Sequence, residues 1–166
     1  MGGMGVLVWM AAHDHQSGYT DDLVCGQIVS WPLGWLRTGW VARVLEGSIA
    51  WSHEQAVGVL TGDAQRDEGG TYNLVTVNGR YLCYADASEE WDGHARDLAL
   101  AFDLHSSDVP DDPRQTQMEL LRIAQVWTAE NADGPDNEPL VVEVATAPLW
   151  PQRPGYTYRG VILLAQ

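Results

Sequence analysis

The sequence predicts a single α+β domain over residues 1–166, with an antiparallel or mixed sheet of about five to seven strands and two main helices on one face. Three observations predict this class. Valine-rich apolar runs open the chain, apolar residues recur at helical spacing near its middle, and apolar runs return at its end. Because the strand-like runs flank the helical segments instead of alternating with them, α+β is favoured over α/β.

The first part of the chain predicts short strands separated by polar turns. Residues 5–13 form an apolar run typical of a buried strand, and residues 14–22 are a polar loop. Residues 23–31 predict a second strand that ends before Pro32. Residues 40–45 predict a further short strand, and residues 52–60 a short helix with Ser52 as its N-cap.

A β-hairpin is predicted at residues 72–84. Two strand-like runs, 72–77 and 80–84, flank the pair Asn78–Gly79. A type I′ turn requires positive φ at both central residues, which Asn–Gly tolerates best. The turn therefore predicts antiparallel pairing of these two runs.

Two helices are predicted at residues 88–104 and 113–130. The first has an apolar stripe, with Ser88 as its N-cap and acids in its first turn. Its stripe consists of Trp91, Ala95, Leu98 and Phe102. The stripe predicted for the second consists of Leu120, Ile123, Ala124 and Trp127. Residues 140–145 and 156–164 then predict the last two strands.

Charge is the feature that bears most directly on function. The chain has nine arginines, no lysine and 23 acids, a net charge of −14, of which residues 61–143 carry −13. The densest acidic stretch contains nine acids and only one arginine, Arg96. These nine are Asp86, Glu89, Glu90, Asp92, Asp97, Asp103, Asp108, Asp111 and Asp112. Such a field repels nucleic acid and anionic membrane surfaces and favours a basic protein partner.

The charge also has a simpler interpretation. Net charge keeps a tryptophan-rich protein soluble. Lysine codons are AT-rich, so the absence of lysine is typical of a high-GC bacterium or one of its phages. Both interpretations leave open whether the acidity binds a partner.

Tryptophans are the second candidate for partner binding. Of the eight, Trp31, Trp35 and Trp40 fall in one short segment that also holds one proline, one arginine and two glycines. Most tryptophan rings are expected in the core, since burying one removes about 200 Å² from water. A ring left exposed in this segment would anchor a protein partner or, alternatively, stack on a sugar.

The two cysteines and the chain start bear on location. Cys25 and Cys83 are too few and too far apart for a disulfide scaffold, so both are expected as buried free thiols in a reducing cytoplasm. No apolar run reaches the roughly 18 residues needed to span a bilayer. The start lacks a basic segment and a clear cleavage site, so no signal peptide is expected.

His13-Asp14-His15 is the best candidate for catalysis. If the strand continued through it, both imidazoles would project to one side and reach one metal ion, with Asp21 or Asp22 as a further ligand. Ordinary solvated loop residues are the alternative. The sequence lacks nucleotide-binding, zinc and nucleophile motifs, so no cofactor is expected and an enzyme is disfavoured.

These observations predict a non-enzymatic acidic protein that occludes a basic surface of a partner, such as a toxin or a nucleic-acid-binding protein. Size and charge are shared with immunity proteins and with phage inhibitors that imitate DNA, but no motif matches. The alternatives are a small metal-dependent hydrolase that uses His13 and His15, and a structural subunit of a phage or other assembly. A homo-oligomer is compatible with each.

Overall fold

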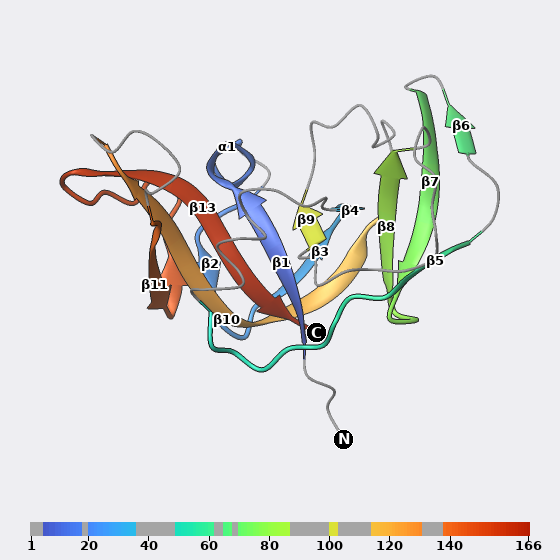
Figure 1. Cartoon of the computed structure of the whole chain (residues 1–166), viewed down its shortest axis with the longest axis horizontal. Coiled ribbons are helices and arrows are strands. Elements are labelled where there is room, and N and C mark those ends of the chain that lie inside the picture. The colour runs from blue at the N-terminus through green and yellow to red at the C-terminus, as the bar shows by residue number, and fades with distance from the viewer. Residues whose placement is uncertain are drawn as a thin grey trace.

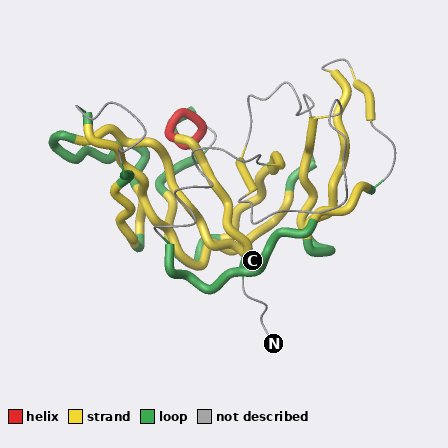
Figure 2. Tube along the Cα trace, in the orientation of Figure 1, coloured by secondary structure: helices red, strands yellow, loops and turns green. Residues whose placement is uncertain are grey.

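The structure is a computed structural model that describes residues 5–17, 20–35, 49–61, 65–67, 70–86, 100–102, 114–130 and 138–166. These residues form thirteen β-strands and one four-residue helix, α1 (Ala12–His15) (Figure 2). The strands are β1 (Val6–Ala11), β2 (Leu23–Val24), β3 (Ile28–Trp31), β4 (Leu33–Trp35), β5 (Gly58–Leu60), β6 (Gln65–Asp67), β7 (Gly70–Val77), β8 (Tyr81–Asp86), β9 (Leu100–Phe102), β10 (Thr116–Ala129), β11 (Leu140–Val144), β12 (Thr146–Ala147) and β13 (Tyr156–Ala165).

The predicted α+β class is wrong, because the described residues are mostly strand. The segment predicted as a helix over 113–130 contains β10, the longest strand described. Within the helix predicted over 88–104, residues 100–102 form β9, and residues 88–99 lie outside the described part. Residues 52–57 are not helical, and β5 follows them.

β10 is a strand because it finds partners along its whole length. Its first residues pair with β3, and residues from Leu120 onward pair with β13 on one side and, from Ile123, with β11 on the other. Both faces of its second half are covered, so every residue from Ile123 to Thr128 is buried. A strand that is buried on both faces is apolar at nearly every position. Its apolar residues therefore also fall at the i, i+3 and i+4 spacing of a helix, and the sequence pattern predicted a helix.

One curved sheet holds most of the strands. Its order is β11-β10-β13-β1-β9-β4-β8-β7-β5, with β3 attached to β10 and β6 to β7, while β12 and β2 form a separate pair. Figure 1 shows β10 curving beneath the other strands, from beside β8 to the tip near β11. The sheet bends so that its two ends share one core.

Two apolar clusters lie on opposite faces of the central strands. In the larger, alternate residues of β1 meet side chains of β7, β8, β10 and β13, including Met10, Val77, Cys83 and Leu163. The smaller cluster contains the intervening residues of β1 and β13, with Trp51 packed over them. Burial of both faces explains why these strands are nearly continuous apolar runs.

Several local predictions are confirmed. β7 and β8 pair antiparallel, and Asn78 and Gly79 have φ of 52° and 68°, as a type I′ turn requires. The strands predicted at 5–13, 140–145 and 156–164 correspond to β1, β11 and β13. The run 23–31 is divided into β2 and β3 at Gly26, whose φ of 89° breaks the strand. The strand predicted at 40–45 lies outside the described residues.

Candidate functional site

Three neighbouring strands, β9, β4 and β8, place one end each at the same side of the sheet, which is called here the β4–β8 edge. β4 runs parallel to β8 and antiparallel to β9, and Trp35 at the end of β4 pairs with Leu100 at the start of β9. Asp86, the last residue of β8, therefore lies at the same edge as Trp35 and Leu100. Asp86 and Leu100 flank residues 87–99, which contain four of the nine acids.

The same pairing divides the acidic stretch. β9 pairs antiparallel with β4. Leu100 at its start lies opposite Trp35, and Phe102 at its end lies opposite Leu33. The acids before β9 and those after it therefore belong to two connections that leave opposite ends of this strand. Apart from Asp86, these acids lie outside the described residues.

The predicted partner-binding residues are only partly within the described chain. Trp31 is buried, with 6% of its surface exposed, and packs in the larger core cluster. Trp35 is half-buried against the same cluster. For Asp86 the structure describes the backbone in β8. The others, Glu89, Glu90, Asp92, Asp97, Asp103, Asp108, Asp111, Asp112 and Trp40, lie outside the described residues.

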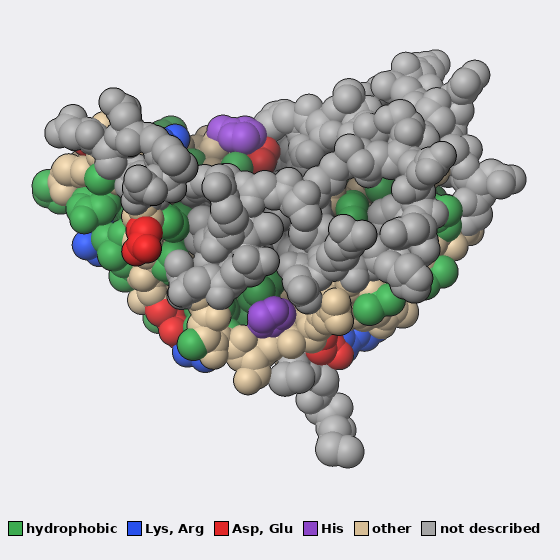
Figure 3. Space-filling view, viewed as in Figure 1, with side chains coloured by type: hydrophobic (Ala, Val, Ile, Leu, Met, Phe, Trp, Pro, Cys, Tyr) green, Lys and Arg blue, Asp and Glu red, His purple; other side chains and the backbone are tan. Residues whose placement is uncertain are grey.

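The described side chains do not account for the charge of the chain. Those whose burial is described include eight acids and five arginines, a net of −3 against −14 for the whole sequence. On the face drawn in Figure 3, the described acidic side chains are scattered and form no single patch. Most of the net charge thus belongs to the remaining residues, which include the acidic connections.

His13 and His15 do not share a site. They lie in the single helical turn α1, where the His13 side chain is 73% exposed and His15 is fully buried. The strand geometry that would point both imidazoles to one side ends at Ala11. Within the described residues, no three His, Cys, Asp or Glu side chains gather as metal ligands would.

His15 is instead part of a buried polar corner. Its Nδ1 lies 2.9 Å from the hydroxyl oxygen of Tyr158, and its backbone carbonyl accepts a hydrogen bond from Thr20. Burial lowers the pKa of His15, and the backbone of Asp21 and the charge of Asp22 offset only part of that effect. The imidazole is held neutral and joins α1 to the start of β13.

We expect acid to destabilise the fold through this histidine. The unfolded chain binds the proton near the ordinary pKa of about 6.5, whereas the folded chain binds it only at lower pH. Stability therefore falls as the pH drops through about 6.5, until the folded-state pKa is passed. Urea denaturation of the wild type between about pH 8 and pH 5 measures this slope.

The matched variants His15→Gln and His13→Gln identify the group responsible. His15→Gln reduces the change in stability between pH 7 and pH 5, while the exposed His13→Gln retains the wild-type slope. Equal slopes in both variants would show that another group causes the acid sensitivity.

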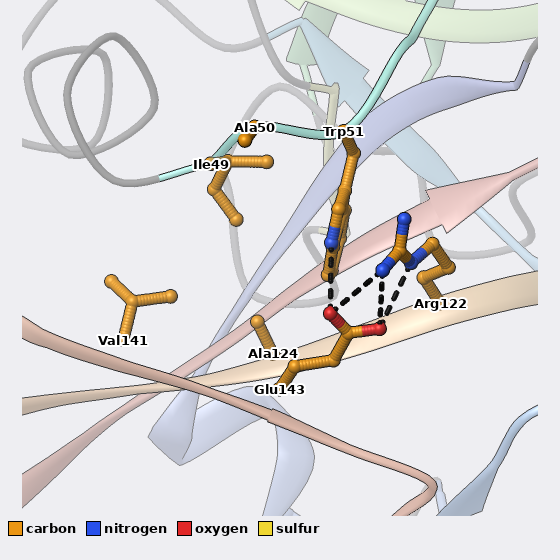
Figure 4. A pocket seen from close by; sticks show the side chains of 7 residues that line it. All are labelled: Ile49, Ala50, Trp51, Arg122, Ala124, Val141 and Glu143. Carbon is orange, nitrogen blue, oxygen red and sulfur yellow. Dashed lines mark hydrogen bonds and ion pairs between the residues drawn. The ribbon is translucent and has the colours of Figure 1, made fainter.

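A second group of side chains, the Trp51 clamp, consists of Trp51, Arg122 and Glu143. Arg122 on β10 donates two hydrogen bonds to Glu143 on β11, from Nε at 2.9 Å and Nη2 at 2.8 Å. The Trp51 indole N–H donates to the same carboxylate at 3.2 Å, and the Arg122 guanidinium lies 5.1 Å from the Trp51 ring centroid. Figure 4 shows the indole nitrogen pointing at the carboxylate, with the guanidinium beside it.

The Trp51 clamp fastens the 49–57 segment to the sheet. Hydrogen bonds from Arg122 hold the pKa of Glu143 below its ordinary value, and the Trp51 N–H adds to that effect. The adjoining cavity of about 330 Å³ has apolar side chains of Ile49, Ala124 and Val141 in its lining. An ionised carboxylate already paired with arginine is a poor proton acceptor, so we assign the clamp a structural role.

Burial keeps the Cys83 thiol unreactive. Both cysteines are free; Cys83 is fully buried and Cys25 half-buried. Burial raises the pKa of the Cys83 thiol, which keeps it protonated. The prediction of buried free thiols is confirmed for Cys83 and only in part for Cys25.

Sequence reasoning missed an aromatic pocket at the far end of β10 and β13, described below. The signal available was the composition of residues 148–158, which hold three prolines, two tyrosines and a tryptophan. The Trp51 clamp had no comparable signal, because Trp51, Arg122 and Glu143 are far apart in sequence.

No helix in the described part of the chain is long and apolar enough to cross a membrane. No protein-family model, no curated protein and no solved structure matches the chain.

Proposed function

We propose that this protein is a non-enzymatic acidic protein that binds a basic protein partner through the edge of the sheet where β4 and β8 end. The observation that carries the proposal is the meeting of Trp35, Asp86 and Leu100 at one edge. β4, which carries Trp35, ends there, and the acidic connection 87–99 begins and ends there.

Charge and scaffold both support this function. A strongly acidic surface accelerates encounter with a basic partner and sets the salt dependence of binding. An aromatic ring beside such a surface supplies the apolar contact that gives most of the affinity. The free thiols of Cys25 and Cys83 support a reducing, cytoplasmic setting.

Two charge variants test which connection binds. The first neutralises the five acids before β9, Asp86, Glu89, Glu90, Asp92 and Asp97, to Asn or Gln. The second neutralises the four acids after it, Asp103, Asp108, Asp111 and Asp112. Their formal net charges become −9 and −10, so the two variants differ little in overall field and chiefly in where carboxylates remain.

Wild type and both variants are immobilised and exposed to lysate of the source organism at low and high salt. We expect a basic protein that is retained by the wild type and the second variant but lost by the first variant and at high salt. With the purified partner, the first variant should lower the association rate about tenfold or more. Retention that is insensitive to salt, or equal for wild type and first variant, contradicts the proposal.

A further inference from the structure

A second surface lies at the start of β13. It is separate from the ends of β4 and β8, where the basic partner is proposed to bind. The aromatic pocket is a hollow of about 330 Å³ lined by Trp127, Tyr156 and Tyr158, by Glu130, Gln152 and Arg153, and by two prolines of the 151–154 loop. It lies where β10 ends and β13 begins, near the tip of the ribbon at the left of Figure 1. Pockets of this size with aromatic walls and a few polar groups are typical small-ligand sites.

The walls of the aromatic pocket are held in place before any ligand arrives. The Trp127 and Tyr158 ring centroids are 5.3 Å apart, with the planes tilted by 52°. The Tyr158 hydroxyl is hydrogen-bonded to the buried His15, which fixes the ring from behind. Preformed rings cost little conformational entropy when a ligand binds.

Aromatic surface is also left uncovered around the pocket. Trp150, one residue before the pocket-lining Pro151, is 70% exposed, more than any other large apolar residue whose burial is described. Tyr156, in the pocket wall, is 36% exposed. An exposed tryptophan beside a preformed aromatic hollow indicates a surface that a ligand covers.

Two observations indicate what the pocket offers a ligand. The Trp127 indole N–H is buried and has no hydrogen-bond partner among the described residues, so the ring offers the pocket its apolar surface and not its donor. The Arg153 guanidinium lies 5.8 Å from the Trp127 ring centroid, over the ring. The guanidinium therefore stacks on this ring and holds its polar N–H groups at the rim of the pocket.

The charges around the pocket favour a neutral ligand. Its rim has one acid, Glu130, and one arginine, Arg153, beside the amide of Gln152. The net charge of −14 disfavours anions, while residues 144–166, with two arginines and no acid, disfavour cations at this end. Planar polar groups around aromatic rings match a ligand that has both an apolar face and many hydroxyls.

We propose that the aromatic pocket binds a neutral carbohydrate through one or two pyranose units. The C–H face of a pyranose carries partial positive charge and stacks on the negative face of an aromatic ring. Its hydroxyls pair with Glu130, Gln152 and Arg153. A proline-rich peptide also stacks on aromatic rings, and its carbonyl oxygens can accept from Gln152 and Arg153, but its prolines have no N–H to donate to Glu130.

Titration calorimetry with three neutral hexasaccharides tests the proposal. The probes are β-1,4-linked glucose, β-1,4-linked N-acetylglucosamine and α-1,4-linked glucose, with decaproline as the competing class. We expect at least one sugar to bind with a Kd between about 10 µM and 1 mM. Binding should change little between low and high salt, which distinguishes it from the salt-dependent binding proposed for the ends of β4 and β8.

Three surface variants and one control assign the site. Trp150→Ala, Tyr156→Ala and Arg153→Ala should each weaken sugar binding about tenfold. Ile28→Ala, an exposed apolar residue on β3 at the opposite end of β10, should leave it unchanged. The proposal is overturned if no hexasaccharide binds, if the three variants bind like the wild type, or if only decaproline binds.

Discussion

Replacing Gly160 by alanine is expected to lower the free energy of unfolding by about 3–5 kcal/mol. Gly160 lies in β13 between β1 and β10 and has a φ of 142°, which L side chains rarely adopt. A Cβ there would lie 2.2 Å from the Met10 carbonyl oxygen and 2.8 Å from a Trp9 ring carbon. The Met10 carbonyl is backbone of β1 and cannot move away without parting the two central strands.

Urea denaturation followed by tryptophan fluorescence measures the effect, and Gly155→Ala is the matched control. Gly155 has a φ of 79°, but a Cβ there would meet no atom within 4 Å. Its substitution should therefore cost only the backbone strain, about 1 kcal/mol. A failure of Gly160→Ala to fold agrees with the prediction, whereas stability within about 1 kcal/mol of the wild type contradicts it.

Met118→Ala is expected to lower the free energy of unfolding by about 2–4 kcal/mol. Met118 is 1% exposed and faces the larger core cluster from β10. In the helix predicted over 113–130, Met118 lies outside the apolar stripe. If that helix were correct, the substitution would change the free energy of unfolding little. This substitution therefore distinguishes the strand from the helix through stability alone.

The neighbouring Gln117→Ala provides the control. Gln117 is exposed on the opposite face of β10, and its removal should change the free energy of unfolding by less than about 0.5 kcal/mol. Equal effects of the two substitutions would show that residues 117 and 118 do not alternate between core and solvent, and the strand assignment would fail.

Prediction from the sequence succeeded where local chemistry decides the structure. Asn78–Gly79 fixes its turn by the φ angles that the pair tolerates, so the hairpin needed no knowledge of distant residues. The valine-rich run of β1 likewise matches only a buried strand. Both features depend on a few adjacent residues.

Prediction failed where distant pairing decides. Residues 116–129 have a spacing compatible with a helix, but β3, β11 and β13 supply partners for their backbone groups. The same applies to the site: Trp35, Asp86 and Leu100 meet only because β4 lies between β8 and β9. The burial of His15 against Tyr158, 143 residues away, was equally invisible in the motif His13-Asp14-His15.

The pairing of β1 with β13 has a consequence for how the chain folds during synthesis. Val6 pairs with Ala165, so two of the central strands of the sheet come from opposite ends of the described chain. While β1 emerges from the ribosome it has neither β13 nor β9 beside it, and its apolar edges remain open. Native structure must therefore form late, by closing a very long loop, and refolding is expected on the slow, millisecond-to-second timescale of proteins dominated by non-local contacts. Throughout that interval the growing chain depends on its own charge, or on a chaperone, to keep β1 from pairing with other chains.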